Sequence, residues 1–304
     1  MRRKDFLSID QLSAEELEGL IARSLEFKQH PFSAPELLSN RTLALLFQKP
    51  SLRTRVSFEV GMLQLGGRSL YLSPAEVGLG EREDAADVAR VLSRYVDGIV
   101  ARTFLHRDVE ALALAASVPV INALSDVGHP CEILGDLLTM QQHLGHLEGL
   151  TVAYVGDGNN VARSLIEAAP LARIRVRVAS PVGYEPNAAA VTAARQAGGA
   201  VEVGNDPEAA VRDADVIYTD AWFSMGQEAE REARAAIFPP YRVTSDLVAA
   251  AARHVIVMHC LPAHRGEEIT AEVIEGPASV VFDQAENRVP AQKALLAELL
   301  AGVG

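Results

Sequence analysis

The sequence predicts an α/β protein of two domains, each a parallel sheet flanked by helices. Short apolar runs alternate with helical patterns along the chain, which is the rhythm of repeated β-α-β units. A long helical pattern near the middle interrupts this alternation, which then restarts. The chain has 304 residues, 49% of them hydrophobic, and these suffice to bury a core in each of two domains.

The first half opens with a helix and continues with a series of expected strands. Ser13 and Glu16 form a capping box that begins a helical pattern through about Lys28. The apolar runs that follow are bounded by turn residues, as buried strands usually are. They are TLALLF (42–47), RSLYL (68–72), DGIVAR (97–102) and VPVINA (118–123).

A long helix is expected next, from about Pro130 to Leu147, and it joins the two domains near residues 130 to 150. The chain shows no tandem repeat and no low-complexity tract. We therefore expect domains at residues 1–147 and 148–285. The expected strands of the second domain are TVAYVGDG (151–158), IRVRVAS (174–180), AVEV (200–203), DVIYTD (215–220), HVIVMHC (254–260) and SVVFDQ (279–284).

Charge and cysteine content exclude several classes of function. The net charge is -12 and no basic tail or stripe is present, so neither nucleic acid nor an anionic membrane surface is an expected partner. Cys131 and Cys260 are far apart and fit neither a disulfide framework nor a structural zinc site. The first residues lack the apolar core of a signal peptide, and no window reaches the roughly 20 apolar residues of a membrane span. We expect a cytoplasmic protein.

Chemically distinctive residues follow the expected strands. In open parallel sheets, ligands bind beyond the carboxyl ends of the strands. Two domains with complementary residues at these ends imply an active site in a cleft between them. The residues in question are Ser51 to Arg55, Arg102 and His129 in the first half, and Asn160, Asp220 and Cys260 in the second.

The stretch FQKPSLRTRVSFE (47–59) has the composition of an anion-binding loop. Ser51 and Thr54 precede a helical pattern that runs through Val56 to Leu65, and a helix N-terminus offers unpaired N–H groups and partial positive charge to a phosphate. Arg53 and Arg55 can add charge-assisted hydrogen bonds. An ordinary N-cap serine beside two solvated arginines is the alternative, and this stretch alone does not decide between them.

This stretch resembles the carbamoyl phosphate loop of the aspartate and ornithine carbamoyltransferases, usually written S-T-R-T-R. The resemblance implies that Ser51, Arg53 and Thr54 hold the phosphate of carbamoyl phosphate and that Leu52 contributes its backbone N–H. It implies a structural role for Arg55.

Further segments resemble the same family in the same order along the chain. They are VARTF (100–104), HPCE (129–132, family pattern H-P-x-Q), HCLPAHRGEE (259–268, family pattern H-C-L-P) and ENRVPAQKAL (286–295). The resemblance implies that Arg102, His129, Glu132 and Arg288 also contact carbamoyl phosphate. It further implies that a C-terminal helix, about 286–304, packs back onto the first domain.

Two segments of the second half concern the acceptor of the carbamoyl group. TDAWFSMGQE (219–228) resembles the D-x-W-x-S-M-G loop of ornithine carbamoyltransferases, and VGDGNNVARSL (155–165) resembles the segment that holds the α-carboxylate of ornithine. GDGNN also looks like a dinucleotide turn, but it lacks the third glycine of GxGxxG. The implied ornithine-binding residues are Asn160, Asp220, Ser224, Met225, Cys260 and Leu261.

The resemblance implies transfer of the carbamoyl group from carbamoyl phosphate to the δ-amine of L-ornithine, which gives L-citrulline. The sequence does not separate a role in arginine biosynthesis from a catabolic role that runs toward carbamoyl phosphate. It implies a homo-oligomer, a trimer or a multiple of trimers, that needs neither metal nor organic cofactor. Two alternatives remain: a transferase for another amine, such as putrescine or acetylornithine, and a catalytically weakened binding paralogue. The implied catalytic residues are Arg53, Thr54, Arg102, His129 and Cys260.

The sequence departs from the family pattern at three positions. Leu52 replaces a common threonine, which matters little if only its N–H is used. Gly78 stands where some relatives place a glutamine that reaches a neighbouring subunit's site. Glu132 replaces the glutamine of H-P-x-Q. Our hypothesis is that Glu132 still accepts a hydrogen bond from the carbamoyl NH2 group, at a cost in affinity because its charge lies near a bound dianion.

Overall fold

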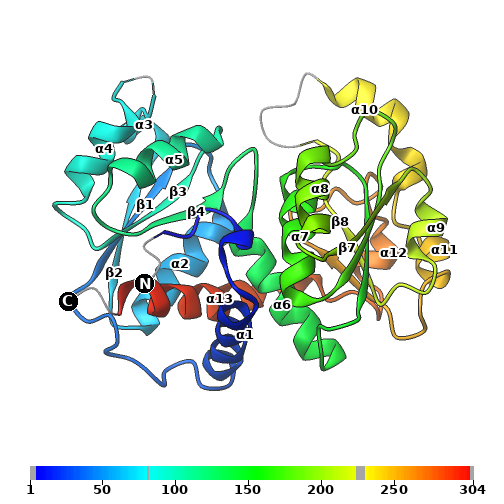
Figure 1. Cartoon of the computed structure of the whole chain (residues 1–304), viewed down its shortest axis with the longest axis horizontal. Helices are drawn as coiled ribbons and strands as arrows, with labels where there is room; N and C mark the ends of the chain where they lie inside the picture. Colours follow the sequence, from blue (N-terminus) through cyan, green and yellow to red (C-terminus); the bar gives the residue numbers. More distant parts are fainter. Residues whose placement is uncertain (1–4, 81, 224–229, 302–304) are drawn as a thin grey trace. The chain divides into compact units, whose positions relative to one another are not determined.

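The computed structural model describes residues 5–80, 82–223 and 230–301, and the chain divides into two compact units (Figure 1). The first unit comprises Met1–Leu138 and Glu286–Gly304, and the second comprises Thr139–Ala285. The boundaries fall inside two helices, α6 (Pro130–Leu144) and α13 (Val281–Leu300). Each unit contains one parallel sheet with helices on both faces, so the predicted fold class is confirmed.

The first unit contains a four-stranded parallel sheet in the order β2-β1-β3-β4. Its strands correspond to the apolar runs expected from the sequence. Phe47, the last residue of one strand, pairs with Arg102, the last residue of the next. The carboxyl ends of these strands therefore lie side by side. The strands are β1 (Thr42–Phe47), β2 (Arg68–Leu72), β3 (Gly98–Arg102) and β4 (Val120–Leu124).

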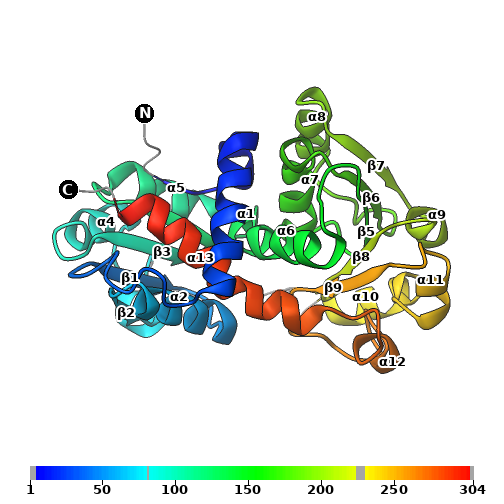
Figure 2. The same ribbon diagram turned by 90° about the horizontal axis from the view of Figure 1, so that it is seen from below.

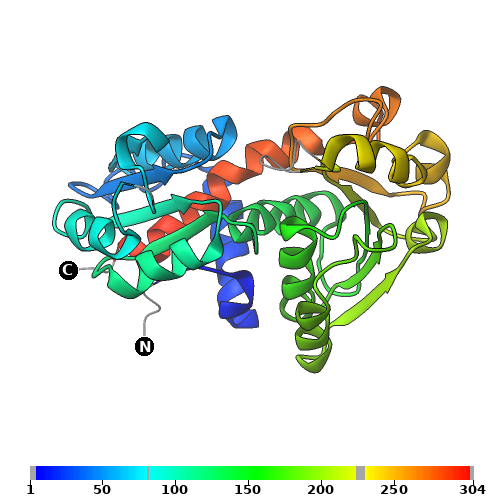
Figure 3. The ribbon, with the colours of Figure 1, turned by 90° about the horizontal axis from the view of Figure 1, so that it is seen from above.

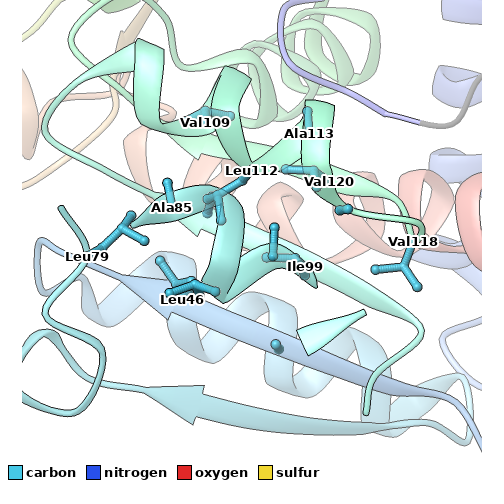
Figure 4. Packing of buried hydrophobic residues seen from close by; sticks show 14 of the residues in the cluster. Leu46, Leu79, Ala85, Ile99, Val109, Leu112, Ala113, Val118 and Val120 are labelled. Atoms are coloured by element: carbon cyan, nitrogen blue, oxygen red, sulfur yellow. The ribbon is translucent and has the colours of Figure 1, made fainter. Parts of the chain in front are cut away.

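Helices cover both faces of this sheet. Two of them, α4 (Ala85–Leu92) and α5 (His106–Ala115), pack their apolar sides onto β1, β3 and β4 and form a buried core (Figure 4). The opposite face carries α1 (Ala14–Gln29), α2 (Leu52–Gln64) and the C-terminal part of α13, which run close together (Figure 2). The short elements of this unit are η1 (Ile9–Gln11) and α3 (Pro74–Val77).

The second unit contains a five-stranded parallel sheet in the order β7-β6-β5-β8-β9. The first strand in sequence lies at the centre of the sheet, and the chain leaves it toward both edges. This arrangement places the ends of β5, β8 and β9 next to one another. The strands are β5 (Thr151–Val155), β6 (Arg175–Ala179), β7 (Ala200–Gly204), β8 (Val216–Thr219) and β9 (Ile256–His259).

The helices of the second unit also form two layers. On one face, α9, α11 and α12 enclose an apolar core with the central strands. On the other face, α7 and α8 lie against each other and against β6 and β7 (Figure 3). The helices are α7 (Asn160–Ala172), α8 (Ala188–Gln196), α9 (Pro207–Val211), α10 (Arg231–Ile237), η3 (Pro239–Tyr241), α11 (Ser245–Ala249) and α12 (Ala271–Ile274).

One strand expected from the sequence is wrong. In the segment SVVFDQ, only Ser279 pairs with a neighbouring strand, through an isolated bridge to Val257, and α13 begins at Val281. A short apolar run without alternation does not distinguish a strand from the first turn of a buried helix.

Within the described ranges, no helix has the length and apolar content to cross a membrane.

Candidate active site

In the first unit, the loop after β1 ends in a capped helix N-terminus. Ser51 is the N-cap of α2 and its Oγ accepts a hydrogen bond from the Thr54 N–H at 3.3 Å. Thr54 is buried, whereas the Leu52 side chain is 75% exposed. Arg55 pairs with Glu59 and lies over the ring of Tyr71, 3.9 Å from its centroid. The first turn of α2 thus presents N–H groups to an anion, while Arg55 is engaged elsewhere.

Arg102 lies beside this loop because β3 pairs with β1. The Arg102 carbonyl accepts a hydrogen bond from the Gln48 N–H at 2.8 Å, and Gln48 Oε1 accepts from the Phe104 N–H at 2.8 Å. Arg102 is buried. These bonds fix the loops after β1 and β3 to each other and place Arg102 at the carboxyl end of the sheet.

His129, Glu132 and Arg288 form a buried cluster beside Thr54. Arg288 Nη1 donates to Glu132 Oε2, and the same carboxylate oxygen lies 3.1 Å from His129 Nε2. Arg288 Nη2 lies 3.5 Å from Thr54 Oγ1. Four of the residues predicted to bind carbamoyl phosphate are thus brought together, although Glu132 and Arg288 are 156 positions apart in the sequence.

The electrostatics of the cluster favour a neutral imidazole and a charged guanidinium. Burial lowers the pKa of His129 well below its usual value, and the positive charges of Arg288, Arg102 and Arg53 lower it further. Burial alone would lower the pKa of Arg288, but Glu132 and other nearby groups raise it. A neutral His129 carries one N–H, which can donate either to Glu132 Oε2 or to the carbonyl oxygen of a ligand, but not to both.

Gly135 on α6 allows Arg288 to approach this closely. A Cβ atom at position 135 would lie 3.0 Å from Arg288 Cδ, which is tighter than an ordinary packing contact. Cys131 is buried in the same turn, and its Sγ donates to the Asn122 carbonyl at 3.4 Å. Burial raises the pKa of Cys131 to about 12, so this thiol stays protonated.

Gly78 has a conformation that explains why a glycine stands there. It caps α3 with a left-handed backbone, φ 56°, and a Cβ atom there would lie 2.7 Å from the Cβ of Arg82. Residues other than glycine rarely adopt this backbone conformation. The left-handed backbone of Gly78 therefore favours glycine at this position.

In the second unit, Asp220 and Cys260 directly follow the neighbouring strands β8 and β9. The Cys260 thiol donates to Asp220 Oδ1 at 2.9 Å, and the Ala221 N–H donates to the same oxygen at 2.7 Å. Asn159 Nδ2 donates to Asp220 Oδ2 at 2.7 Å. Both carboxylate oxygens are thus held in place, and the carboxylate offers negative charge to an ammonium group.

Asn159, which our sequence analysis did not select, orients Asp220. It is the N-cap of α7, its Oδ1 accepts from the N–H groups of Val161 and Ala162, and Asn160 begins the helix. The Tyr154 hydroxyl lies 3.1 Å from the same Oδ1. The sequence could have indicated Asn159, because it directly precedes a helical pattern and asparagine is a preferred N-cap.

The backbone around Cys260 is fixed by a second hydrogen-bond network. The Leu261 N–H donates to His259 Nδ1 at 2.8 Å, so His259 in this tautomer carries its proton on Nε2, which lies 3.1 Å from Glu268 Oε1. Burial would raise the pKa of Glu268, but bonds from His259 and the His264 N–H lower it. Leu261 itself has φ 55°, a strained value for a leucine, and precedes a cis bond to Pro262.

Arg234 on α10 anchors the segment after Asp220. Its Nη1 donates to Asp157 Oδ2 at 2.8 Å and to the Trp222 carbonyl at 2.6 Å, and its Nε donates to Glu230 at 2.9 Å. The guanidinium also lies 4.7 Å from the ring centroid of Tyr184. Ser224 and Met225, two predicted ornithine-binding residues, lie outside the described residues.

The described residues include two groups whose donor atoms are close enough to hold a metal ion: Asp220, His259 and Cys260, and His264, Glu267 and Glu268. In the first group, the contacts of His259 with Leu261 and Glu268 already occupy both ring nitrogens. Metal binding would require the ring to give up one of these bonds. The geometry favours a hydrogen-bonded network over a metal centre.

Comparison with known proteins identifies the family. The profile of the aspartate/ornithine carbamoyltransferase carbamoyl-P binding domain matches residues 4–142, and that of the Asp/Orn binding domain matches residues 148–299. The chain belongs to the aspartate/ornithine carbamoyltransferase family. Among curated members, the ornithine carbamoyltransferase of Thermococcus kodakarensis is 52% identical, and the alignment covers 99% of this chain and 97% of the relative.

Solved structures of the family are similar over the same length. Ornithine carbamoyltransferase from Pyrococcus furiosus has a TM-score of 0.95 and 51% identity, covering 99% of this chain and 98% of that one. The enzyme from Thermus thermophilus has a TM-score of 0.91 and 46% identity, covering 99% and 100%. One curated relative, from Pyrococcus furiosus, carries the description anabolic and is 52% identical over 99% of this chain and 97% of its own length.

Proposed function

We propose that this chain transfers the carbamoyl group of carbamoyl phosphate to the δ-amine of L-ornithine, which yields L-citrulline and phosphate. The observation that carries the proposal is the pairing of Asp220 with Cys260 at the ends of β8 and β9, in a chain about half identical to named ornithine carbamoyltransferases. A carboxylate held by Asn159 and Ala221 suits the α-ammonium group of an amino acid. Acetylornithine lacks this group, and putrescine is not an amino acid.

Carbamoyl phosphate is assigned to the first unit. The N-terminus of α2 with Ser51 and the Leu52 N–H, together with Arg53, Arg102 and Arg288, would neutralise the phosphate dianion. Thr54, Arg102 and His129 would donate hydrogen bonds to the carbamoyl oxygen, and Glu132 would accept one from the carbamoyl NH2 group. The proximity of Thr54, His129 and Arg288 to one another supports this assignment.

The reaction follows from these positions. The δ-ammonium of ornithine, with a pKa near the roughly 10.4 of lysine, must lose its proton before its lone pair can attack the carbamoyl carbon. The developing oxyanion would be stabilised by Thr54, Arg102 and neutral His129. When the C–O bond to phosphate breaks, the leaving phosphate can accept the proton released by the amine. Catalysis then rests on positioning and electrostatic stabilisation.

Ornithine is assigned to the second unit. Asp220 would bind its α-amino group, Asn160 its α-carboxylate, and Ser224, Met225 and Leu261 would complete the site. Cys260 would lie beside the δ-amine and orient it rather than form a covalent bond. The contacts of Asp220 with Cys260 and Asn159 support a shared binding site.

We also propose a cytoplasmic homo-oligomer, a trimer or a multiple of trimers. Both cysteines are free and buried, as is usual in a reducing compartment. The outer side of α2 and the edge strand β2 expose large apolar side chains, among them Leu52, Leu63 at 74% and Leu70 at 51%. An apolar edge of this kind is normally covered by another chain. Sedimentation of the purified protein would measure the assembly directly.

The test of function is steady-state carbamoyl transfer with ornithine, putrescine, acetylornithine or aspartate as acceptor. Efficient ureido product formation with ornithine alone is the expected result. Asp220→Asn should raise the KM for ornithine by roughly 10- to 100-fold, the effect of losing a charge-assisted bond. Asp97→Asn is the matched control, because Asp97 pairs with Arg41 at the amino end of β3. Turnover with another amine, or none, would refute the proposal.

A further inference from the structure

Glu132 is the position at which this chain departs from H-P-x-Q, and the structure shows which charge it faces. The carboxylate is 1% exposed and contacts Arg288 Nη1 and His129 Nε2. His129 is neutral, because burial and three arginines lower its pKa. The charge of Glu132 is therefore balanced above all by Arg288, which is equally buried.

The Arg288 guanidinium has further N–H donors that can bind another anion. Its Nη2 lies 3.5 Å from Thr54 Oγ1, a long contact, and its Nε has no hydrogen-bond partner among the residues that the structure describes. Gly135 leaves room for the side chain, and the bond to Glu132 holds it in place. A fixed guanidinium with donors left over next to a threonine hydroxyl is suited to a phosphate oxygen.

We propose that Glu132 competes with the phosphate of carbamoyl phosphate for the charge of Arg288 and so sets the affinity of the phosphate site. The proposal rests on the proposed function for the placement of phosphate at Arg288. A buried guanidinium needs a counter-charge, and either anion can supply it. Bound together, a carboxylate and a dianion repel each other through a medium that screens poorly.

The same competition couples phosphate affinity to stability. A glutamine at position 132 retains an oxygen that accepts from Arg288 but removes the largest counter-charge of the guanidinium, which leaves Asp136 as the nearby buried carboxylate. The Glu132→Gln protein should therefore be less stable in phosphate-free buffer. Phosphate should stabilise it more than it stabilises the wild type, because at a fixed ligand concentration the stabilisation grows with the logarithm of the affinity. If the charge of Glu132 had no influence on Arg288, the glutamine variant would show neither the lower stability nor the larger stabilisation by phosphate.

The experiment compares the full-length wild type with the variants Glu132→Gln, Glu132→Asp and Glu167→Gln. Glu167 is a buried carboxylate in the second unit, 2.8 Å from Nε of the half-buried Arg163, so its variant controls for loss of a partly buried ion pair. Calorimetric titration measures the Kd of inorganic phosphate and of carbamoyl phosphate, and thermal unfolding is followed with and without phosphate.

Glu132→Gln should bind both ligands about tenfold more tightly or better, with a lower Tm in phosphate-free buffer and a larger phosphate-induced increase in Tm. Glu132→Asp keeps the charge and should retain the wild-type Kd within about threefold. Glu167→Gln should also keep the wild-type Kd. Unchanged or weaker phosphate binding by Glu132→Gln would overturn the proposal, as would equal tightening by Glu132→Asp.

If Glu132→Gln does not fold without phosphate, refolding is repeated over a phosphate series. Recovery that depends on phosphate supports the competition, and failure to recover at any concentration refutes it. Phosphate binding can be measured without turnover, so the experiments test the competition for Arg288 independently of the proposed carbamoyl transfer. Absence of carbamoyl transfer with tighter phosphate binding would reject the function alone, whereas normal citrulline formation with unchanged phosphate binding would reject the competition alone.

Discussion

Replacement of Asp157 by Asn should remove a pH dependence from the stability of the second unit. Asp157 follows β5, is 8% exposed and accepts a hydrogen bond from Arg234. Burial raises its pKa from 3.8 to about 6, even though the positive charge of Arg234 acts in the opposite direction. Asparagine has a similar shape but does not titrate in this range.

The sign and size of the effect follow from proton linkage. The folded pKa lies above the unfolded one, so the folded state binds the proton more tightly and this contribution to stability is lost as pH rises through 6. For pKa values of 3.8 and about 6, the free energy of unfolding of the wild type should fall by about 1.4 kcal/mol relative to Asp157→Asn between pH 5 and pH 7.5. The loss of the bond to Arg234 adds only a constant offset.

The assay is urea unfolding followed by tryptophan fluorescence at several pH values. The chain has one tryptophan, Trp222, which is buried in the second unit and whose carbonyl contacts Arg234. The signal therefore reports the unit that is perturbed. Asp246→Asn, at an exposed position in the first turn of α11, is the matched control and should follow the wild type. Parallel curves for the wild type and Asp157→Asn over this pH range would refute the reasoning.

Two further predictions concern one residue from each unit. Asn159→Ala should lower the free energy of unfolding by about 1–2 kcal/mol, because it removes the N-cap of α7, and it should raise the KM for ornithine but not for carbamoyl phosphate. Asn159→Ser keeps a capping oxygen without placing a second carboxylate beside Asp220, so an equal loss of stability in urea would contradict the capping account. Burial lowers the pKa of Lys293 from 10.5 to about 8, so the wild type should gain stability as pH rises from 8 to 10, while Lys293→Met should not. Equal slopes in urea titrations would rule out the assignment to Lys293.

The helix start and most of the strands were predictable because each depends on residues that are close together in the sequence. The capping box of Ser13 and Glu16 is present at the start of α1, and the apolar runs of both sheets are strands, except for SVVFDQ. That segment failed because α13 begins at Val281, and its first two residues continue the apolar run that Val280 starts. Pattern alone does not resolve this ambiguity.

The contacts inside the candidate site were not predictable in the same way. Asp157 and Arg234 are 77 positions apart, and neither belongs to a motif with a fixed spacing. The family resemblance placed Glu132 and Arg288 near one ligand but did not indicate that they contact each other. Such pairs depend on how helices pack, and helix packing is set by the whole core rather than by neighbours in sequence.

The first unit is discontinuous in sequence, and this has a consequence for synthesis on the ribosome. Residues 139–285 form a continuous unit that can fold as soon as it emerges, whereas the first unit lacks residues 286–304 until the second has been made. Two buried cations of the first unit, Arg288 and Lys293, are therefore synthesised only after the whole second unit. The nascent first unit must therefore stay competent to fold while the second is translated, with the side of α2 that later receives Lys293 open to chaperones.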